Sequence, residues 1–158
     1  MLDRQSVLTI FEETAKVFLF NLDFIGDDKL DWKPAQGAKS VLEIVNHLAP
    51  FLDSISAQLD GESKTSAPAT KVPATNRDEA KTILAGAAKR YASAVRGASS
   101  QALNAPFRDD LPFSLGWMVT ASTIDTIHHA GQIAYIQTLL GDDEIHFDGS
   151  KLPEWAVD

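Results

Sequence analysis

The chain has 158 residues, of which 44% are hydrophobic and 23% are charged, a composition typical of globular proteins. Its length predicts a single domain over residues 1–158. Acidic residues outnumber basic ones by 22 to 14, and the net charge of −8 argues against nucleic acid and membrane surfaces as partners. The absence of cysteine excludes disulfides, thiolate metal sites and a thiol nucleophile belonging to the protein.

The N-terminal sequence places acidic residues on both sides of a short apolar run, which does not resemble a secretory signal. No apolar run approaches the roughly 20 residues that cross a bilayer. We therefore expect a cytoplasmic protein.

Apolar residues recur at spacings of three and four over residues 4–22, which predicts a first helix. The following stretch, residues 23–39, contains glycine and proline and shows no long apolar period, so it is predicted to be a loop. It still carries Phe24, Leu30 and Trp32. These large apolar side chains predict that the loop packs on the helices.

A second helix is predicted over Ser40–Asp60. Its start has the sequence of a capping box, with Ser at the N-cap and Glu43 three residues later, and Gly61 follows as its stop. Pro50 lies inside this helix and predicts a kink about one turn after His47.

Two further helices are predicted. Residues 61–74 read as an exposed connection, and a third helix begins at Thr75 or Asn76 and runs to Gly97. A break over residues 98–113 precedes a fourth helix from Ser114 to just before Gly141, and the tail of residues 142–158 is expected to drape over the bundle. No strand-like alternation appears. The sequence therefore predicts an all-α four-helix bundle.

One stripe of the fourth helix has the 4–3 spacing of a core seam. Its members are Met118, Ser122, Asp125, His129, Gln132, Ile136 and Leu139. Both ends of the stripe are apolar, but its middle is polar. Burying four polar groups in succession costs several kcal/mol unless each has a partner.

Asp125 and His129 are four residues apart, so their side chains meet on adjacent turns and can bind one divalent metal. His47, which we expect on the core face of the second helix, is the candidate third ligand. His128 lies about 60° around the helix from Asp125, and His146 lies in the tail. Two imidazoles and one carboxylate leave coordination positions open, as catalytic metal sites do.

Other interpretations of the same residues remain open. Asp125 could orient His129 within a hydrogen-bonded core network, with Gln132 as a further hydrogen-bonding group, in a bundle that binds no metal. The ligand set is also that of mononuclear iron oxygenases, although those enzymes are normally built on β-barrels.

Two segments resemble the DinB/YfiT-like superfamily. Asp125–Ile133, continuing to Leu140–Gly141, is similar to the closing helix of that family, in which a His-x-x-x-His pair leads into Gly-Gln and ends at Leu-Gly. Leu30–Pro34, followed by Ser40 and His47, is similar to its Trp-x-Pro loop and Ser-capped helix, whose histidine is the third ligand.

The resemblance implies a four-helix bundle of the DinB type that is often dimeric and holds one divalent metal, often nickel or zinc, on three histidines. His47 and His129 match ligand positions, whereas Asp125 stands where the family usually has a histidine. Aspartate can bind zinc, nickel or iron, and we take His47, Asp125 and His129 as the candidate metal ligands.

The leading interpretation is a metal-dependent enzyme, either a thiol S-transferase or a hydrolase-like relative. Characterised relatives include thiol-dependent S-transferases and isomerases that use low-molecular-weight thiols such as bacillithiol or mycothiol. We accordingly expect a small-molecule substrate and a homodimer, and Gln132, Ser122 and Trp117 are candidates to orient the incoming group. The alternative function is a small-molecule-binding or structural bundle that has lost the metal.

Overall fold

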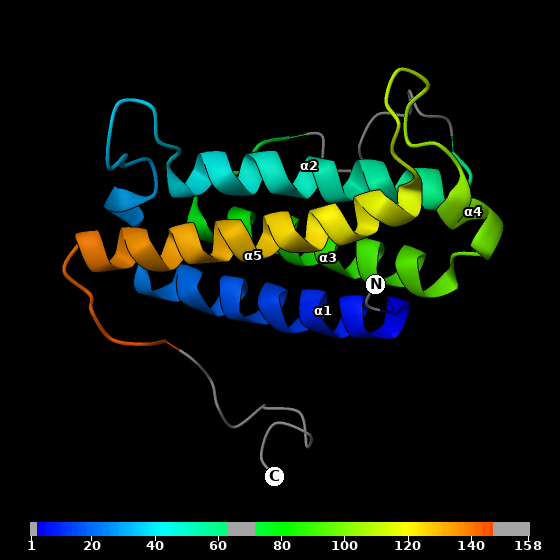
Figure 1. The fold of residues 1–158 in the computed structure, drawn as a ribbon. Helices are drawn as coiled ribbons and strands as arrows, with labels where there is room; N and C mark the ends of the chain where they lie inside the picture. Colours follow the sequence, from blue (N-terminus) through cyan, green and yellow to red (C-terminus); the bar gives the residue numbers. More distant parts are fainter. Residues whose placement is uncertain (1–2, 63–71, 147–158) are drawn as a thin grey trace, which may run out of the picture.

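The computed structural model describes residues 3–62 and 72–146 of the chain, and their regular secondary structure is helical. Within these residues, four long helices lie side by side (Figure 1). They are α1 (Arg4–Asn21), α2 (Val41–Leu59), α3 (Arg77–Gly97) and α5 (Leu115–Leu139). In the described residues the only β pairing is an isolated bridge between Pro106 and Ser114. The all-α four-helix prediction is confirmed.

Three short helices lie between the long ones. Two 3-10 turns, η1 (Leu22–Phe24) and η2 (Asp27–Lys29), follow α1. The single-turn helix α4 (Ser100–Asn104) lies inside the predicted break over residues 98–113 and was not predicted. It is too short to show a helical period in the sequence, and only the Ser99 side chain, which accepts from the backbone N–H of Ala102, marks its start.

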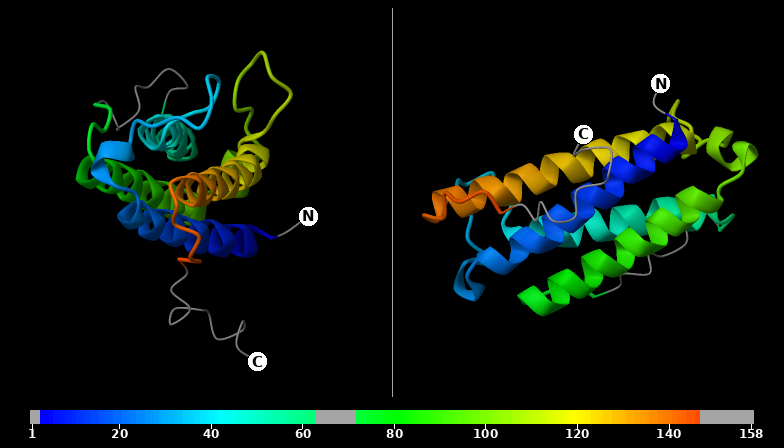
Figure 2. Two further views of the ribbon diagram at one scale, coloured as in Figure 1. Left: turned by 90° about the vertical axis from the view of Figure 1, so that its left-hand side faces the viewer. Right: turned by 90° about the horizontal axis from the view of Figure 1, so that it is seen from below.

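The helices form a ring in which α1 and α2 each pack against both α3 and α5 (Figure 2). The Arg4 guanidinium donates to the Ala98 carbonyl and joins the start of α1 to the end of α3, so these two helices are antiparallel. In contrast, α2 and α3 run in the same direction, which requires a crossover between them. The Asn46 side chain bonds both the N–H and the C=O of Ala74 and so anchors the end of this crossover beside the first half of α2.

Local signals set the helix ends as predicted. Ser40 Oγ accepts from the Glu43 N–H while Glu43 Oε2 accepts from the Ser40 N–H, which are the two bonds of a capping box. Gly61 and Gly141 follow α2 and α5 at φ +85° and +99°, a conformation that favours glycine. Helix α2 continues through Pro50, and the kink expected there remains a prediction.

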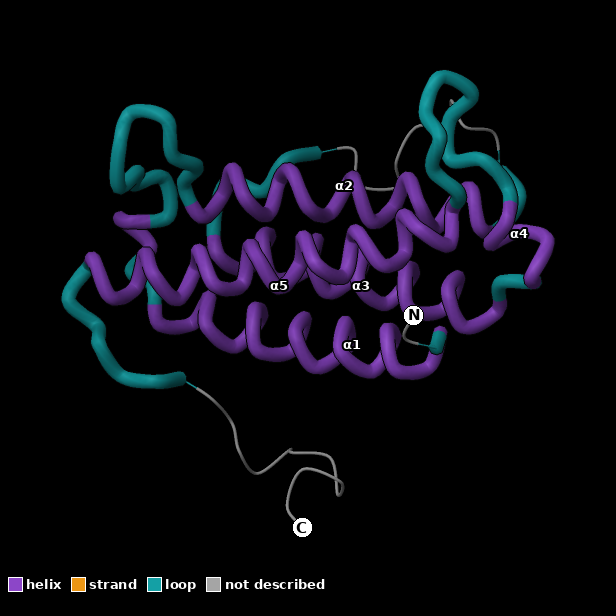
Figure 3. Tube along the Cα trace, in the orientation of Figure 1, coloured by secondary structure: helices purple, strands orange, loops and turns teal. Residues whose placement is uncertain are grey.

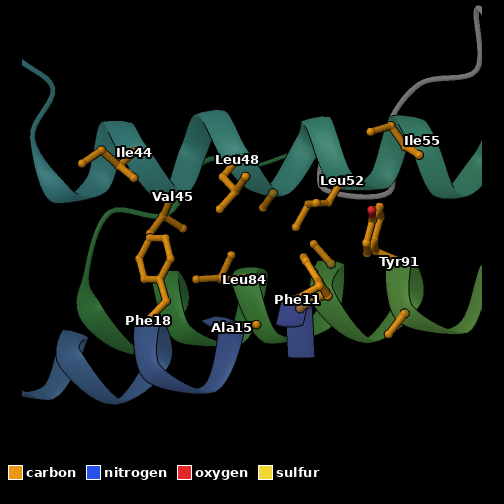
Figure 4. Packing of buried hydrophobic residues seen from close by; sticks show 14 of the residues in the cluster. Phe11, Ala15, Phe18, Ile44, Val45, Leu48, Leu52, Ile55, Leu84 and Tyr91 are labelled. Carbon is orange, nitrogen blue, oxygen red and sulfur yellow. The ribbon is translucent and has the colours of Figure 1, made fainter. Parts of the chain in front are cut away.

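Buried apolar side chains of α1, α2 and α3 meet between the helices (Figure 4). The rings of Phe11 and Tyr91 lie 4.4 Å apart, and the Tyr91 hydroxyl is 2.9 Å from the backbone oxygen of Val119 and 2.7 Å from Ser122 Oγ. The loop after α1 also contributes, because Leu30 is buried and Trp32 packs against the core. The prediction that residues 23–39 pack on the bundle is thus confirmed.

The loops before α2 and before α5 lie at opposite ends of the bundle, whereas the described end of the crossover runs beside α2 (Figure 3). The described part of the tail, residues 142–146, returns to the end of α1, where the His146 ring stacks on Phe24 and its carbonyl accepts from the Asn21 amide. The remainder of the predicted tail and residues 63–71 of the predicted connection lie outside the described residues. Within the described chain, no helix combines the length and apolar character needed to span a membrane.

Candidate metal centre

The three predicted ligands come together between α2 and α5. One ligand atom from each of His47, Asp125 and His129 lies within 4.8 Å of the other two. His129 Nε2 is 3.5 Å from Asp125 Oδ1, and the rings of His47 and His129 lie 5.5 Å apart at an interplanar angle of 80°. The i, i+4 spacing on α5 and the antiparallel packing of α2 against α5 produce this cluster.

His129 is the buried member of the cluster, with only 4% of its surface exposed. Its Nδ1 lies 2.7 Å from Gln132 Oε1. Because Oε1 can only accept, Nδ1 carries the hydrogen and Nε2 carries a lone pair. Nε2 is buried and has no hydrogen-bond partner in the described chain. The ring is therefore fixed in the tautomer and orientation of a metal-ligating histidine, with its other nitrogen bonded to an outer group.

Burial lowers the pKa of His129 below its usual value of 6.5, and this effect outweighs the opposing influence of Gln132 and Asp125. The imidazole is accordingly neutral at pH 7. A neutral ring does not form an ion pair with Asp125, so the 3.5 Å contact leaves both groups able to accept a cation.

The donor set fits a small divalent ion. Two ligand atoms that are each about 2.1 Å from a tetrahedral ion lie about 3.4 Å apart, which the Asp125–His129 pair already matches. The ligand atom of His47 lies within 4.8 Å of the other two, so it needs only a short approach to reach this spacing. His47 is exposed and can make this adjustment by rotating its side chain.

The cluster lies at one side of a cavity of about 470 Å³. Helix α5 contributes His128, Gln132, Tyr135 and Ile136 to its lining in addition to the cluster, and the loop before α2 contributes Pro34, Gly37, Ala38 and Lys39. This loop lies at the same end of the bundle as the C-terminal half of α5 (Figure 1). A second cavity, of about 460 Å³, shares Gly37, Ala38, Lys39 and His47 with the first. Both cavities therefore border His47 and the loop before α2.

Two details of the predicted placement are wrong. His47 is exposed, not on the core face of α2, because the buried face of that helix is centred on Val45, Leu48 and Leu52. The buried stripe of α5 is also rotated from the predicted seam. Its members are Leu115, Met118, Val119, Ser122, Thr123, Thr126, His129, Ile133, Ile136 and Gln137.

This rotation leaves Asp125 and Gln132 half-buried at the edge of the cavity and exposes Leu139. Of the three candidates to orient an incoming group, only Gln132 lines the cavity. Ser122 is bonded to Tyr91 inside the core, and Trp117 stacks on Phe113.

Sequence reasoning missed Lys39 and Tyr135 and assigned no site role to His128, whose ring lies 5.3 Å from that of His129. A signal for the α5 residues was present. Asp125, His128, Gln132 and Tyr135 follow one another at spacings of 3, 4 and 3, which traces a polar stripe beside the buried one. No local pattern points to Lys39, because its place depends on how the loop folds over the helices.

The profile of the DinB superfamily matches residues 10–133 of the chain. The crystal structure of a DinB-like protein from Bacillus subtilis superposes with a TM-score of 0.72 over 90% of this chain and 96% of that one. At 14% identity, this likeness shows the fold alone. No curated protein matches the sequence significantly. The profile match covers most of the chain, and the protein belongs to the DinB superfamily.

Proposed function

We propose that the protein is a metal-dependent enzyme in which His47, Asp125 and His129 hold one divalent ion. The observation that carries this proposal is the buried Nε2 of His129, which has no hydrogen-bond partner in the described part of the chain and lies beside a carboxylate and a second imidazole at a cavity. A buried polar atom without a partner is costly unless a ligand satisfies it. Nickel and zinc accept two imidazoles and one carboxylate, and iron accepts the same set.

The residues around the cluster have separable roles in this proposal. Gln132 holds the proton of His129 on Nδ1 and so keeps the Nε2 lone pair directed at the ion. Ile136 and the Tyr135 ring supply apolar walls to the cavity. The chemistry that a bound divalent ion supplies is Lewis acidity, which lowers the pKa of a thiol or a water molecule at an open position.

The reaction that we propose is transfer of a low-molecular-weight thiol to an electrophile. Because the chain has no cysteine, the nucleophilic sulfur must come from solution. The sulfur forms a bond to carbon of the electrophile, the bond from that carbon to the leaving group breaks, and the thiol proton passes to solvent. The cavity of about 470 Å³ is of the size that small-molecule sites occupy.

A non-catalytic bundle without metal is the alternative, and the 3.5 Å contact between His129 and Asp125 is the observation that favours it. That contact would stabilise the fold as an ion pair only if His129 were protonated. Since burial lowers the pKa of His129, the pair contributes little near pH 7, and we favour the metal site.

Metal analysis of the purified protein separates the two functions. We expect one divalent ion per chain, a lower melting temperature after chelation, and at least tenfold weaker metal binding in Asp125→Ala. Asp125→His should retain binding, because imidazole replaces carboxylate one turn before His129. His128→Ala is the matched control, since His128 lines the same cavity outside the cluster. A metal-free protein that is indifferent to chelator would establish the non-catalytic alternative.

Thiol transfer is tested separately on the metal-loaded protein. A panel of low-molecular-weight thiols is assayed with a chromogenic electrophile such as 1-chloro-2,4-dinitrobenzene. We expect turnover that chelation abolishes and that Asp125→Ala reduces at least tenfold. Metal binding without turnover of any thiol would contradict the transferase activity but not the metal site.

We also propose that the protein forms a homodimer through the outer face of α5. This face exposes Trp117, Ile124, Ile127 and Tyr135. Asp125 is the only Asp, Glu, Lys or Arg between Leu115 and Leu139, so two copies with a net charge of −8 can approach there with little repulsion. Light scattering after gel filtration tests this, and a monomer at all concentrations would contradict it.

A further inference from the structure

Lys39 is the cation at the mouth of the candidate metal cavity. It is exposed and lies in the loop immediately before Ser40, the N-cap of α2. It lines both the cavity that contains the cluster and the cavity beside it. Among the residues that the structure describes, no other lysine or arginine lines the cavity of the cluster.

The neighbouring lysines form ion pairs, whereas Lys39 forms none among the described residues and acts on Glu43 only through space, where its charge helps to lower the pKa of that carboxyl. Lys29 pairs with Asp28, and Lys33 pairs with Glu43. The Glu43 carboxylate accepts from Lys33 and from the Ser40 N–H, and it makes no hydrogen bond to Lys39 among the described residues. Among the described residues, no carboxylate lies within ion-pair distance of Lys39. Its charge therefore remains available to a ligand.

The balance of charge in this cavity is opposite to that of the whole chain. Asp125 contributes a carboxylate and Lys39 an ammonium group to this cavity, and histidines that ligate a metal do so in their neutral form. A divalent ion in the cluster makes the site positive by two charges, on a protein whose net charge is −8. Field lines concentrate in such a cleft and favour an anion in it.

We propose that Lys39 binds a carboxylate of the substrate, so that the enzyme takes small thiols that carry an acidic group. This inference rests on the proposed function. His47 lies seven residues beyond Ser40 on α2, about 10 Å along the helix, and the flexible side chain of Lys39 spans part of that separation. A short molecule can thus reach the cluster with its sulfur while its carboxylate contacts Lys39, which acts as a specificity-determining residue.

The test compares two thiols that differ only in charge. 3-Mercaptopropionate and 3-mercaptopropionamide are titrated into the zinc-loaded protein by calorimetry. We expect the wild type to bind the acid at least tenfold more tightly than the amide, and Lys39→Met to reduce this preference below threefold. Lys39→Arg should keep the preference. Lys29→Met should also keep it, because it removes the same charge from the same segment outside both cavities.

Zinc stoichiometry and circular dichroism are measured first for each variant, with Lys39→Gln as a second charge-removing variant if Lys39→Met does not fold. A wild type that binds zinc but takes acid and amide equally well would overturn this inference and leave the metal site standing. The inference would also be overturned, with the metal site left standing, if Lys39→Met kept the preference for the acid. It would likewise be overturned if Lys29→Met abolished that preference as completely as Lys39→Met. Failure of the wild type to bind zinc, nickel or iron would overturn the proposed function and this inference together.

Discussion

The hydrogen bond between His129 and Gln132 makes a specific prediction for replacement of Gln132 by methionine. Methionine has similar length but only a weakly accepting sulfur, so His129 Nδ1 loses the oxygen that lies 2.7 Å away. The proton is then no longer held on Nδ1, and the Nε2 lone pair is available for only part of the time. We therefore expect Gln132→Met to weaken metal binding without removing a ligand.

The magnitude follows from the outer position of Gln132. Loss of a group that orients a ligating histidine costs about 10- to 100-fold in metal affinity, or about 1.4–2.7 kcal/mol. The metal-free protein should also become less stable, because a buried N–H without a partner costs about 1–3 kcal/mol. Gln132 is only half-buried, so water can partly replace its hydrogen bond to His129. We therefore expect the loss of metal affinity and the loss of stability to lie near the lower limits of these ranges.

The assay is a zinc titration against a competing chelator, together with urea unfolding of the metal-free protein. Gln137→Met is the matched control, since Gln137 is buried on the same helix but does not line the cavity. Gln132→Glu should retain binding because a carboxylate also accepts from Nδ1–H. Equal zinc affinity of wild type and Gln132→Met would refute the orienting role.

Three further predictions concern stability. Ser40→Ala should lower the free energy of unfolding by about 1 kcal/mol through loss of the α2 cap, and a urea midpoint within error of wild type would contradict this. Tyr91→Phe should lower the free energy of unfolding by about 1–2 kcal/mol, because it removes the buried hydroxyl. Zinc affinity should stay unchanged, and a weaker affinity would mean that the core and the site are coupled. Because burial lowers the folded-state pKa of His129 below 6.5, the unfolded chain protonates first on acidification. The metal-free protein should therefore lose stability as the pH falls below 6.5. Urea unfolding at several pH values measures this loss, and His129→Gln should lack the part of the pH dependence that His129 contributes.

The long helices were predictable because their signals are local. The capping box at Ser40 and the glycines after α2 and α5 act within one turn of the positions that they define. The single-turn helix α4 has no such period, and its position depends on packing against α5. The rotation of the buried α5 stripe also depends on the whole bundle, because α5 contacts α1 on one side and α2 on the other.

Some residues of the candidate site could likewise be predicted from local sequence, and others could not. Asp125, His129 and Gln132 lie on one helix at spacings of four and three, so their mutual contacts follow from helix geometry alone. His47 was identified by its residue type and by family resemblance, but the reason first given for its position, a place on the core face of α2, is wrong. Lys39 could not be identified because it reaches the cavity only after the loop before α2 has folded.

The cap of α2 connects these two parts of the site. The Ser40–Glu43 box fixes where α2 begins, and His47 follows about two turns later, opposite His129. Glu43 also pairs with Lys33, which holds the loop that carries Lys39 against the start of the helix. One carboxylate thus fixes both the helix start and the loop that carries Lys39. The position of the third metal ligand and the place of Lys39 at the cavity therefore depend on the same local motif.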